Sequence, residues 1–227
     1  MKSTVLAQET GSYQQIDDTS GTVNGLNHYV QIVCNDDYSA FFTTAKKDRL
    51  SIIDVLTNFA PRKFLYNQEA LELFVQMKIP QKHIDALSQK VKQNEIYFEQ
   101  KINKLLDKLI NLGAKQRNKI KDACAIAAYH KQTDYPVIPI LLSDDAPQFN
   151  LLAQKHALCW VHDGRHYKKL NPIVPQFHEK LEQFRGQYWD YYGELFKYKK
   201  NPNPTEAERL RLKFDHLFST CDWLCPT

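Results

Sequence analysis

The alternation of apolar and polar positions at the start of the chain predicts strands. Runs of β-branched and aromatic residues are separated there by the turn sequences Ser20-Gly21, Asn24-Gly25 and Asn35-Asp36-Asp37. Because consecutive strands joined by short turns usually pair with each other, we expect a three-stranded antiparallel meander. Its strands are predicted at Ser12–Thr19, His28–Cys34 and Ala40–Thr44.

Two further strands are predicted downstream from short apolar runs. Pro136–Leu142 and Ala157–His162 both have the composition of strands buried on both faces of a sheet. Asp145 and Gln148 resemble a capping box and predict a helix directly after the first of these runs. If Asp145 caps that helix, Asp144 is left at the carboxyl end of a central strand, where open α/β sheets place their ligands.

Apolar residues recur at helical spacing through most of the middle of the chain. Ser51 with Asp54 predicts the capping box of a short helix that packs on the sheet. Residues 62–133 contain several helical patterns and no convincing strand. We therefore expect a helical insertion between the meander and the fourth strand.

Residues 178–219 predict a helical hairpin, with Thr205 and Glu208 capping its second helix. The first helix carries an apolar stripe in strict helical phase, which favours a core position over a base-stacking platform. The stripe consists of Leu181, Phe184, Tyr188, Tyr191 and Leu195.

This order of elements predicts an α/β fold in which helices flank a mixed sheet. The sheet should contain the three-strand antiparallel meander plus two further strands. We expect residues 1–12 to be a disordered end, residues 13–220 to form one core, and residues 221–227 to be a divergent tail.

The composition fits a globular protein and limits its environment. The chain has 227 residues, 43% of them hydrophobic, which is ample for a core. No apolar run approaches the roughly 20 residues of a membrane span, and no signal-peptide pattern begins the chain. The five cysteines are scattered and odd in number. We therefore expect a cytoplasmic protein with no membrane partner.

The net charge of +4 is compatible with a nucleic-acid partner but does not require one. The densest basic run is Lys115–Lys121, which lies in a helical pattern. A solvated helix face is the more common explanation for such a run. The alternative is a face that contacts backbone phosphates.

Two acidic pairs carry the candidate chemistry. Asp17-Asp18 lies on the first predicted strand, and Asp144-Asp145 follows the fourth. Adjacent carboxylates repel one another, whereas Mg²⁺ takes oxygen ligands and would hold them ionised. Paired metal ions held in this way carry out phosphoryl transfer. The alternative is that these aspartates are ordinary turn and cap residues.

Several stretches of the chain form a specific set when they are taken together. They are Asp17–Thr19, Val23–Gly25, Asn27–Tyr29, Phe41–Thr44, Ser143–Phe149 and Leu158–Arg165. They resemble the catalytic domain of insertion-sequence-66-like bacterial transposases of the Asp-Asp-Glu (DDE) class. The likeness extends from about Tyr13 to Thr220. It implies a ribonuclease H-like fold that cleaves DNA and transfers strands, with transposon ends and target DNA as partners and with possible self-association.

The resemblance also implies roles for the acidic pairs. Asp17 and Asp144 correspond to the first two ligands of catalytic Mg²⁺ or Mn²⁺, with Asp18 and Asp145 as alternates. The third ligand of the family, a glutamate on a later helix, has no match in this chain. The glutamates considered for it are Glu182, Glu194, Glu206 and Glu208. We therefore expect a truncated internal piece with impaired catalysis, or else a non-catalytic DNA-binding or oligomerisation remnant.

Three basic residues after the last predicted strand are candidates for contact with phosphate or DNA: His162, Arg165 and Lys168. The alternative is that they are turn residues without a ligand. Cys159 and His162 have a spacing found in zinc sites, but no second pair completes four ligands. Cys159 is better explained as a small buried core residue.

Overall fold

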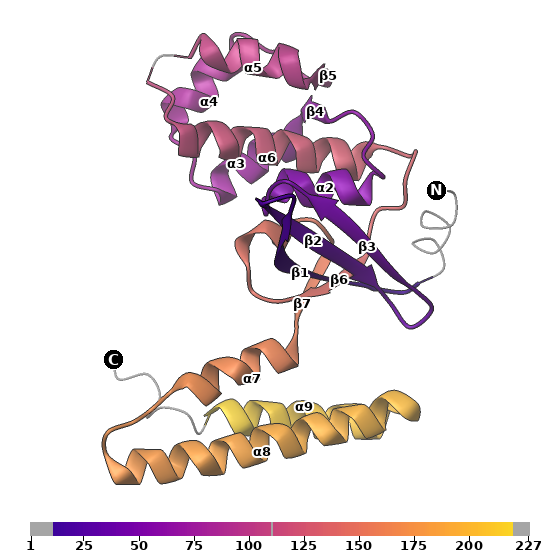
Figure 1. Ribbon diagram of the computed structural model, residues 1–227, viewed down its shortest axis with the longest axis vertical. Coiled ribbons are helices and arrows are strands. Elements are labelled where there is room, and N and C mark those ends of the chain that lie inside the picture. Colours follow the sequence, from indigo (N-terminus) through magenta and orange to yellow (C-terminus); the bar gives the residue numbers. More distant parts are fainter. Residues whose placement is uncertain (1–10, 110, 220–227) are drawn as a thin grey trace. The chain divides into compact units, whose positions relative to one another are not determined.

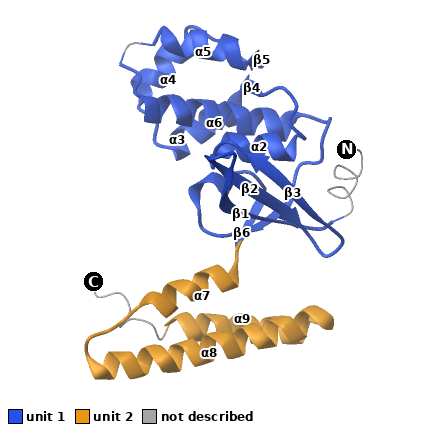
Figure 2. Ribbon diagram, viewed as in Figure 1, with its two compact units in different colours: residues 1–157 blue, residues 158–227 orange. Residues whose placement is uncertain are grey.

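The computed structural model describes residues 11–109 and 111–219. The chain divides into two compact units, residues 1–157 and residues 158–227 (Figure 2). Of the predicted disordered end, only Gly11 and Ser12 fall within the described residues, and the predicted tail at 221–227 lies outside them.

A five-stranded mixed sheet organises unit 1 (Figure 1). Its strands are β1 (Gln14–Val23), β2 (Leu26–Cys34), β3 (Ser39–Thr44), β6 (Ile140–Ser143) and β7 (Lys155–Leu158). Their order across the sheet is β3-β2-β1-β6-β7. β2 is antiparallel to both β1 and β3, whereas β1 is parallel to β6. The predicted mixed α/β fold, with a meander and two further strands, is confirmed.

A tight turn fixes the register of β1 and β2. Val23 pairs with Leu26, so the loop contains only Asn24 and Gly25. Their φ angles are 51° and 77°, the left-handed values that a two-residue hairpin of type I′ requires. Asn-Gly is the preferred sequence for such a turn. The predicted end of the first strand at Thr19 and start of the second at His28 are wrong, because pairing continues through Ser20-Gly21 up to Val23 and Leu26.

One face of the sheet is buried by helices. Ile16, Val33 and Leu141 come from three neighbouring strands and belong to one core cluster. That cluster also contains Ile52 from α2 (Arg49–Leu56) and Ile120 from α6 (Ala114–Lys131). Residues of β1 alternate between the two faces, so Gln14, Ile16 and Asp18 share the covered one.

The helix predicted after the meander is α2, but its N-cap lies three residues before the predicted one. Asp48 is the N-cap, and its Oδ1 accepts hydrogen bonds from Ser51 N at 2.9 Å and from Ser51 Oγ at 2.7 Å. The predicted Ser51–Asp54 capping box is wrong. Asp54 instead accepts two hydrogen bonds from the Arg62 guanidinium, at 2.8 and 2.6 Å.

The insertion contains two strands as well as helices, so the prediction of no strand there is wrong. Its elements are β4 (Lys63–Tyr66), α3 (Gln68–Gln76), α4 (Gln81–Ser88), β5 (Glu95–Phe98), α5 (Glu99–Asp107) and α6. β4 and β5 form a separate antiparallel pair. Phe64 and Leu65 of β4 are buried, and β4 contacts α6. Phe64, Leu65 and Tyr66 are consecutive and all buried, so β4 shows no alternation, and a short apolar run does not distinguish a strand from a helix.

The segment after β6 differs from the prediction in its local structure. β6 begins at Ile140, so Pro136–Pro139 lie outside the strand. The expected helix is a single turn of 3₁₀-helix, η1 (Pro147–Phe149), whose N-cap Ala146 makes no side-chain capping bond. The predicted Asp145–Gln148 capping box is therefore wrong.

The predicted buried strand at Ala157–His162 is also wrong. The strand β7 ends at Leu158, is mostly exposed, and lies at the edge of the sheet. α7 (Trp160–Lys169) begins immediately afterwards. A six-residue apolar run does not distinguish a strand from a helix start, and Trp160 packs among aromatic side chains of unit 2.

Three helices make up the described part of unit 2: α7, α8 (Pro175–Lys200) and α9 (Pro204–Ser219). The predicted hairpin is confirmed by α8 and α9, which contact each other. The predicted stripe is core, since four of its members are buried and Leu195 packs against the same cluster. The predicted Thr205–Glu208 cap is wrong, because Asn203 Oδ1 accepts the hydrogen bond from Glu206 N at 2.9 Å.

Candidate active site

The two acidic pairs occupy equivalent places on neighbouring strands. The last paired residues of β1 and β6 are Gln15 and Leu142. Asp17 lies two residues beyond Gln15, and Asp144 lies two residues beyond Leu142. Extending the parallel register by these two residues brings Asp17 level with Asp144. The strand order confirms that β1 and β6 are neighbours within one sheet, and Asp144-Asp145 directly follow the last residue of β6.

The consecutive aspartates of β1 have different surroundings. Asp17 Oδ1 accepts a hydrogen bond from Asp18 N at 2.8 Å, and Asp17 is only partly buried. On the neighbouring strand, the pKa of the Cys34 thiol is raised by burial and, to a lesser extent, by the charge of Asp17. Asp17 therefore shares the less covered face of the sheet with Cys34.

Asp18 points into the covered face and is already paired. Its side chain is only 3% exposed, and Lys47 Nζ lies 2.5 Å from its Oδ1. Gln148 Nε2 donates a hydrogen bond to its Oδ2 at 3.0 Å. A buried carboxylate requires such partners, because desolvation of an unpaired charge is costly. Lys47 comes from the loop between β3 and α2, and Gln148 from η1.

Carboxylates of β1 and of the turn after β6 both affect the pKa of Lys47. The hydrogen bond to Asp18 is the main cause that raises the pKa of Lys47, while desolvation lowers it. The charges of Asp18, Asp144 and Asp17 raise this pKa further. These three aspartates are called the acidic cluster below.

Asp144 shapes the turn at the end of β6. Its Oδ1 accepts a hydrogen bond from Ala146 N at 3.1 Å, which is a turn contact between residues two apart. Asp145 is exposed. The turn leaves Asp144 half-buried beside the carboxyl end of the strand.

A serine and a histidine next to this turn were missed by the sequence analysis. Ser143 Oγ lies 2.8 Å from His156 Nε2 and also donates to Asp144 O at 2.8 Å. Burial lowers the pKa of His156, and the nearby charge of Asp144 opposes this effect. Ser143 is 1% exposed. The pair therefore holds the end of β6 in place next to Asp144.

The predicted phosphate-contacting residues lie in unit 2. His162, Arg165 and Lys168 are spaced three apart on α7, so each is a neighbour of the next on the helix surface. Arg165 and Lys168 are exposed, and His162 is half-buried. Their contact with DNA stays a prediction.

The basic run on α6 has partners within unit 1. Arg117 NH1 lies 2.6 Å from Asp107 Oδ1, and Lys121 forms an ion pair with Glu99. Lys119 Nζ donates to Met77 O. These contacts tie α6 to the rest of the insertion, which favours a structural role for this run.

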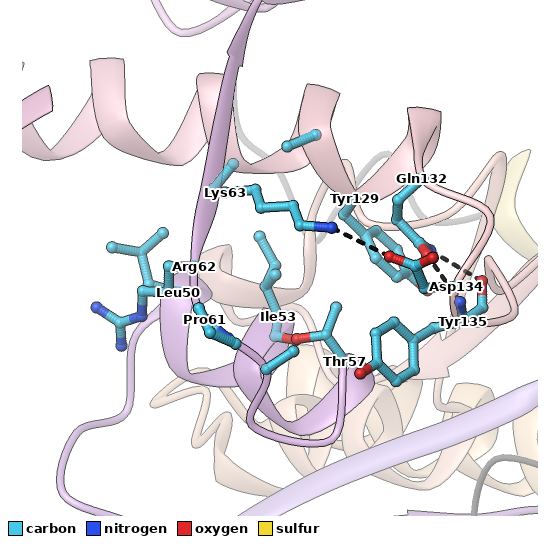
Figure 3. A pocket seen from close by; sticks show the side chains of 13 residues that line it. Leu50, Ile53, Thr57, Pro61, Arg62, Lys63, Tyr129, Gln132, Asp134 and Tyr135 are labelled. Atoms are coloured by element: carbon cyan, nitrogen blue, oxygen red, sulfur yellow. Dashed lines mark hydrogen bonds and ion pairs between the residues drawn. The ribbon is translucent and has the colours of Figure 1, made fainter. Parts of the chain in front are cut away.

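A pocket elsewhere in unit 1 contains none of the acidic cluster (Figure 3). It encloses about 450 Å³ of space, part of which is open to solvent. Its walls are mostly apolar, with the Lys63–Asp134 ion pair at 3.0 Å and hydrogen bonds between Gln132 and Tyr135. It brings together no nucleophile, base and orienting group, so we assign it no chemistry.

Residues 11–109 and 111–219 contain no group of three His, Cys, Asp or Glu side chains placed to hold a metal. The glutamates considered as a third ligand all form ion pairs in the helical hairpin: Glu182 with Arg185, Glu194 with Arg209 and Lys213, Glu206 with Arg209, and Glu208 with Arg211. Within these two ranges, no further side chains complete a zinc site with Cys159 and His162.

Comparisons with known proteins give one distant relative. The chain is 26% identical over 211 residues to the uncharacterized protein y4jO of Sinorhizobium fredii (strain NBRC 101917 / NGR234). The match covers 91% of this chain and 64% of the length of that relative. No protein-family model matches the chain, and no solved structure matches it. None of the helices in the described part of the chain is long and apolar enough to cross a membrane.

Proposed function

We propose that this chain is part of the catalytic core of a DNA transposase of the DDE class, with a ribonuclease H-like fold. The observation that carries the proposal is that β1, which contains Asp17-Asp18, is the parallel neighbour of β6, which Asp144-Asp145 directly follow. The resemblance of the motifs to insertion-sequence-66-like transposases supports the same assignment. DNA is the substrate and partner that follows from it, and self-association is a further expectation.

The donor atoms suit a hard divalent cation such as Mg²⁺ or Mn²⁺. Asp17 and Asp144 would supply carboxylate oxygens, the ligands that these ions prefer. In a bound state the ions would polarise a phosphodiester and activate the attacking oxygen. The fit is one of ligand type but not of ligand number, because no third ligand is grouped with them in the described residues.

Asp17 is preferred over Asp18 as the ligand from β1. Asp18 is buried, forms an ion pair with Lys47 and accepts a hydrogen bond from Gln148, so recruiting it to a metal would require breaking both contacts. Asp17 lies on the less covered face, level with Asp144 when the register is extended. Asp145 is exposed, whereas Asp144 is held by its own turn.

Catalysis by this chain is expected to be impaired, because two carboxylates hold a pair of metal ions less firmly than three. The same observation favours a second candidate function, a non-catalytic DNA-binding or oligomerisation remnant. In that case DNA binding would be independent of divalent metal.

The test measures DNA binding by gel shift and nicking of supercoiled plasmid in Mn²⁺. We expect binding that weakens when Arg165 and Lys168 are both changed to Glu, and nicking that is weak or absent.

Nicking that Asp144→Asn abolishes, and that Asp37→Asn leaves intact, would show a complete catalytic centre and contradict the expected impairment. Asp37 is a matched control because it is an exposed aspartate in the β2–β3 turn. A folded chain that binds neither DNA nor Mn²⁺ would contradict the proposal.

A further inference from the structure

β3 (Ser39–Thr44) forms one edge of the five-stranded sheet of unit 1 (Figure 1). Among the residues that the structure describes, β2 is its only strand partner. The backbone N–H and C=O groups of β3 that point away from β2 therefore pair with no other described strand. A free edge of this kind is a template for pairing with another strand, and proteins commonly protect it with charges, proline, a bulge or short length.

β3 has none of these protective features. Its sequence, Ser-Ala-Phe-Phe-Thr-Thr, contains no charged residue and no proline. Its pairing with β2 continues through all 6 residues without a bulge. The opposite edge of the sheet is protected, because β7 has only 4 residues and begins with Lys155. Of these two edges, β3 is therefore the one suited to the addition of a strand.

Phe41 gives this edge an exposed apolar side chain. It is 67% exposed and points to the same face of the sheet as Ile32, the residue opposite it on β2. The next residue, Phe42, points to the other face and packs against the core. A second strand beside β3 would cover part of the Phe41 ring, and aromatic pairs across neighbouring strands stabilise a sheet.

The charges on either side of β3 indicate which strand fits. Asp36 lies in the turn before β3 and Lys46 in the loop after it, and both are exposed. Each lies five positions from Phe41. Two antiparallel copies of β3 with Phe41 opposite Phe41 would therefore bring Asp36 of each copy opposite Lys46 of the other. A parallel arrangement would bring like charges together, so the edge is complementary to itself in the antiparallel orientation.

We infer that β3 is a self-association surface, at which two copies of this chain pair their β3 strands in antiparallel orientation around Phe41. The inference deepens the self-association expected with the proposed function, and it rests on that function in this respect alone. The contact is isologous, because both copies contribute the same residues. It is small compared with the roughly 20–30 residues a side of a stable interface, so the dimer forms reversibly and depends on concentration.

The experiment measures the mass of the full chain by sedimentation equilibrium between about 1 and 200 µM, where we expect a monomer–dimer equilibrium. Phe41→Lys places two like charges opposite each other at the centre of the contact and should weaken dimerisation at least about tenfold. Leu26→Lys is the matched control, because Leu26 is 66% exposed and lies on the same face of the sheet but outside β3. Its dimerisation should stay close to that of the wild type.

Charge-swapped variants test the orientation and the register. Asp36→Lys and Lys46→Glu should each weaken the dimer several-fold, because each brings like charges together at both ends of the contact. An equimolar mixture of the two variants should restore dimerisation, since each copy then meets the opposite charge. Asp36 also accepts a hydrogen bond from Tyr13, but mixing cannot repair the loss of that contact within one chain. Failure of the mixture to dimerise would overturn antiparallel pairing around Phe41.

Two further results would overturn the inference without touching the proposed metal site. One is a folded chain that stays monomeric over the whole concentration range. The other is a dimer that Phe41→Lys and Leu26→Lys affect equally. Conversely, a folded chain that dimerises through β3 but binds neither DNA nor Mn²⁺ would leave the inference standing and contradict the proposed function.

Hydrogen exchange of the wild type tests the same surface without a substitution. Backbone amides of β3 should exchange several-fold more slowly at about 200 µM than at about 1 µM, because pairing with a second copy protects them. Amides of β7, at the opposite edge of the sheet, should exchange equally at both concentrations. Equal exchange of β3 at both concentrations would overturn the inference.

Discussion

Gln148 Nε2 donates a hydrogen bond to Asp18 Oδ2 at 3.0 Å and thereby joins η1 to β1 across 130 residues of sequence. With this contact both carboxylate oxygens of Asp18 have a partner, since the other oxygen pairs with Lys47. It also places the turn that contains Asp144 against the strand that contains Asp17. The geometry of the acidic cluster therefore depends on a residue that is itself neither acidic nor basic.

Gln148→Ala should lower the free energy of unfolding by about 1–2 kcal/mol, because a buried charged acceptor loses a donor. Urea denaturation at neutral pH measures the change. Gln154→Ala is the matched control, since Gln154 is exposed in the loop before β7, and it should stay within about 0.5 kcal/mol of the wild type. Equal effects of the two substitutions would mean that the contact with Asp18 does not stabilise the fold.

Acidification should destabilise unit 1 through His156. Its folded-state pKa is lowered from 6.5, mainly by burial, so folding favours the neutral imidazole. The resulting stability is fully present above pH 6.5 and is lost as pH falls through the lower folded-state value. His156→Gln keeps a polar partner for Ser143 but cannot titrate.

The free energy of unfolding is measured between pH 7.5 and pH 5 for both proteins. The wild type should lose more stability than His156→Gln over this range, because only the wild type has an imidazole that must take up a proton. A loss that is identical in the two proteins would assign the pH dependence to other groups.

Gly164 allows α7 to approach α8 closely, and Gly164→Ala should destabilise unit 2. A Cβ at this position would lie 2.7 Å from Trp189 Cζ2 and 3.1 Å from Tyr188 Cε1. The overlap should cost about 1–3 kcal/mol, partly offset by the higher helix propensity of alanine. Unfolding followed by tryptophan fluorescence measures it.

Gly186→Ala on α8 provides the contrast, because no atom lies within 4 Å of the added Cβ. Because alanine has a higher helix propensity than glycine, the substitution should stabilise the helix by up to about 1 kcal/mol. If both alanines stabilised unit 2 alike, the close approach at Gly164 would be relaxed at little cost.

The sequence is most informative where local rules decide the structure. Asn24-Gly25 fixes the first hairpin, and the strict phase of Tyr188 and Tyr191 identifies the core face of α8. β4 was missed because its consecutive buried residues show no alternation, and a short apolar run fits a helix as well as a strand. The run at Ala157–His162 was misassigned because Trp160 starts a helix whose partners are distant aromatic side chains.

The candidate site could be predicted only in part. Strand order follows from topology rules, so the meeting of the two acidic pairs was accessible from the sequence. The contact between Lys47 and Asp18 was not accessible, because no spacing rule connects a loop lysine to an acid on another strand. Ser143 and His156 were missed for the same reason. Such contacts depend on tertiary packing and not on periodicity.

The most direct test of the central claim is calorimetric titration of the full chain with Mn²⁺, comparing the wild type with Asp17→Asn, Asp144→Asn and the control Asp37→Asn. If Asp17 and Asp144 share one metal site, each of their substitutions should weaken binding by at least about tenfold, and the control should not. Wild-type affinity in either Asp17→Asn or Asp144→Asn, or absence of binding by a folded wild type, would contradict a shared metal site.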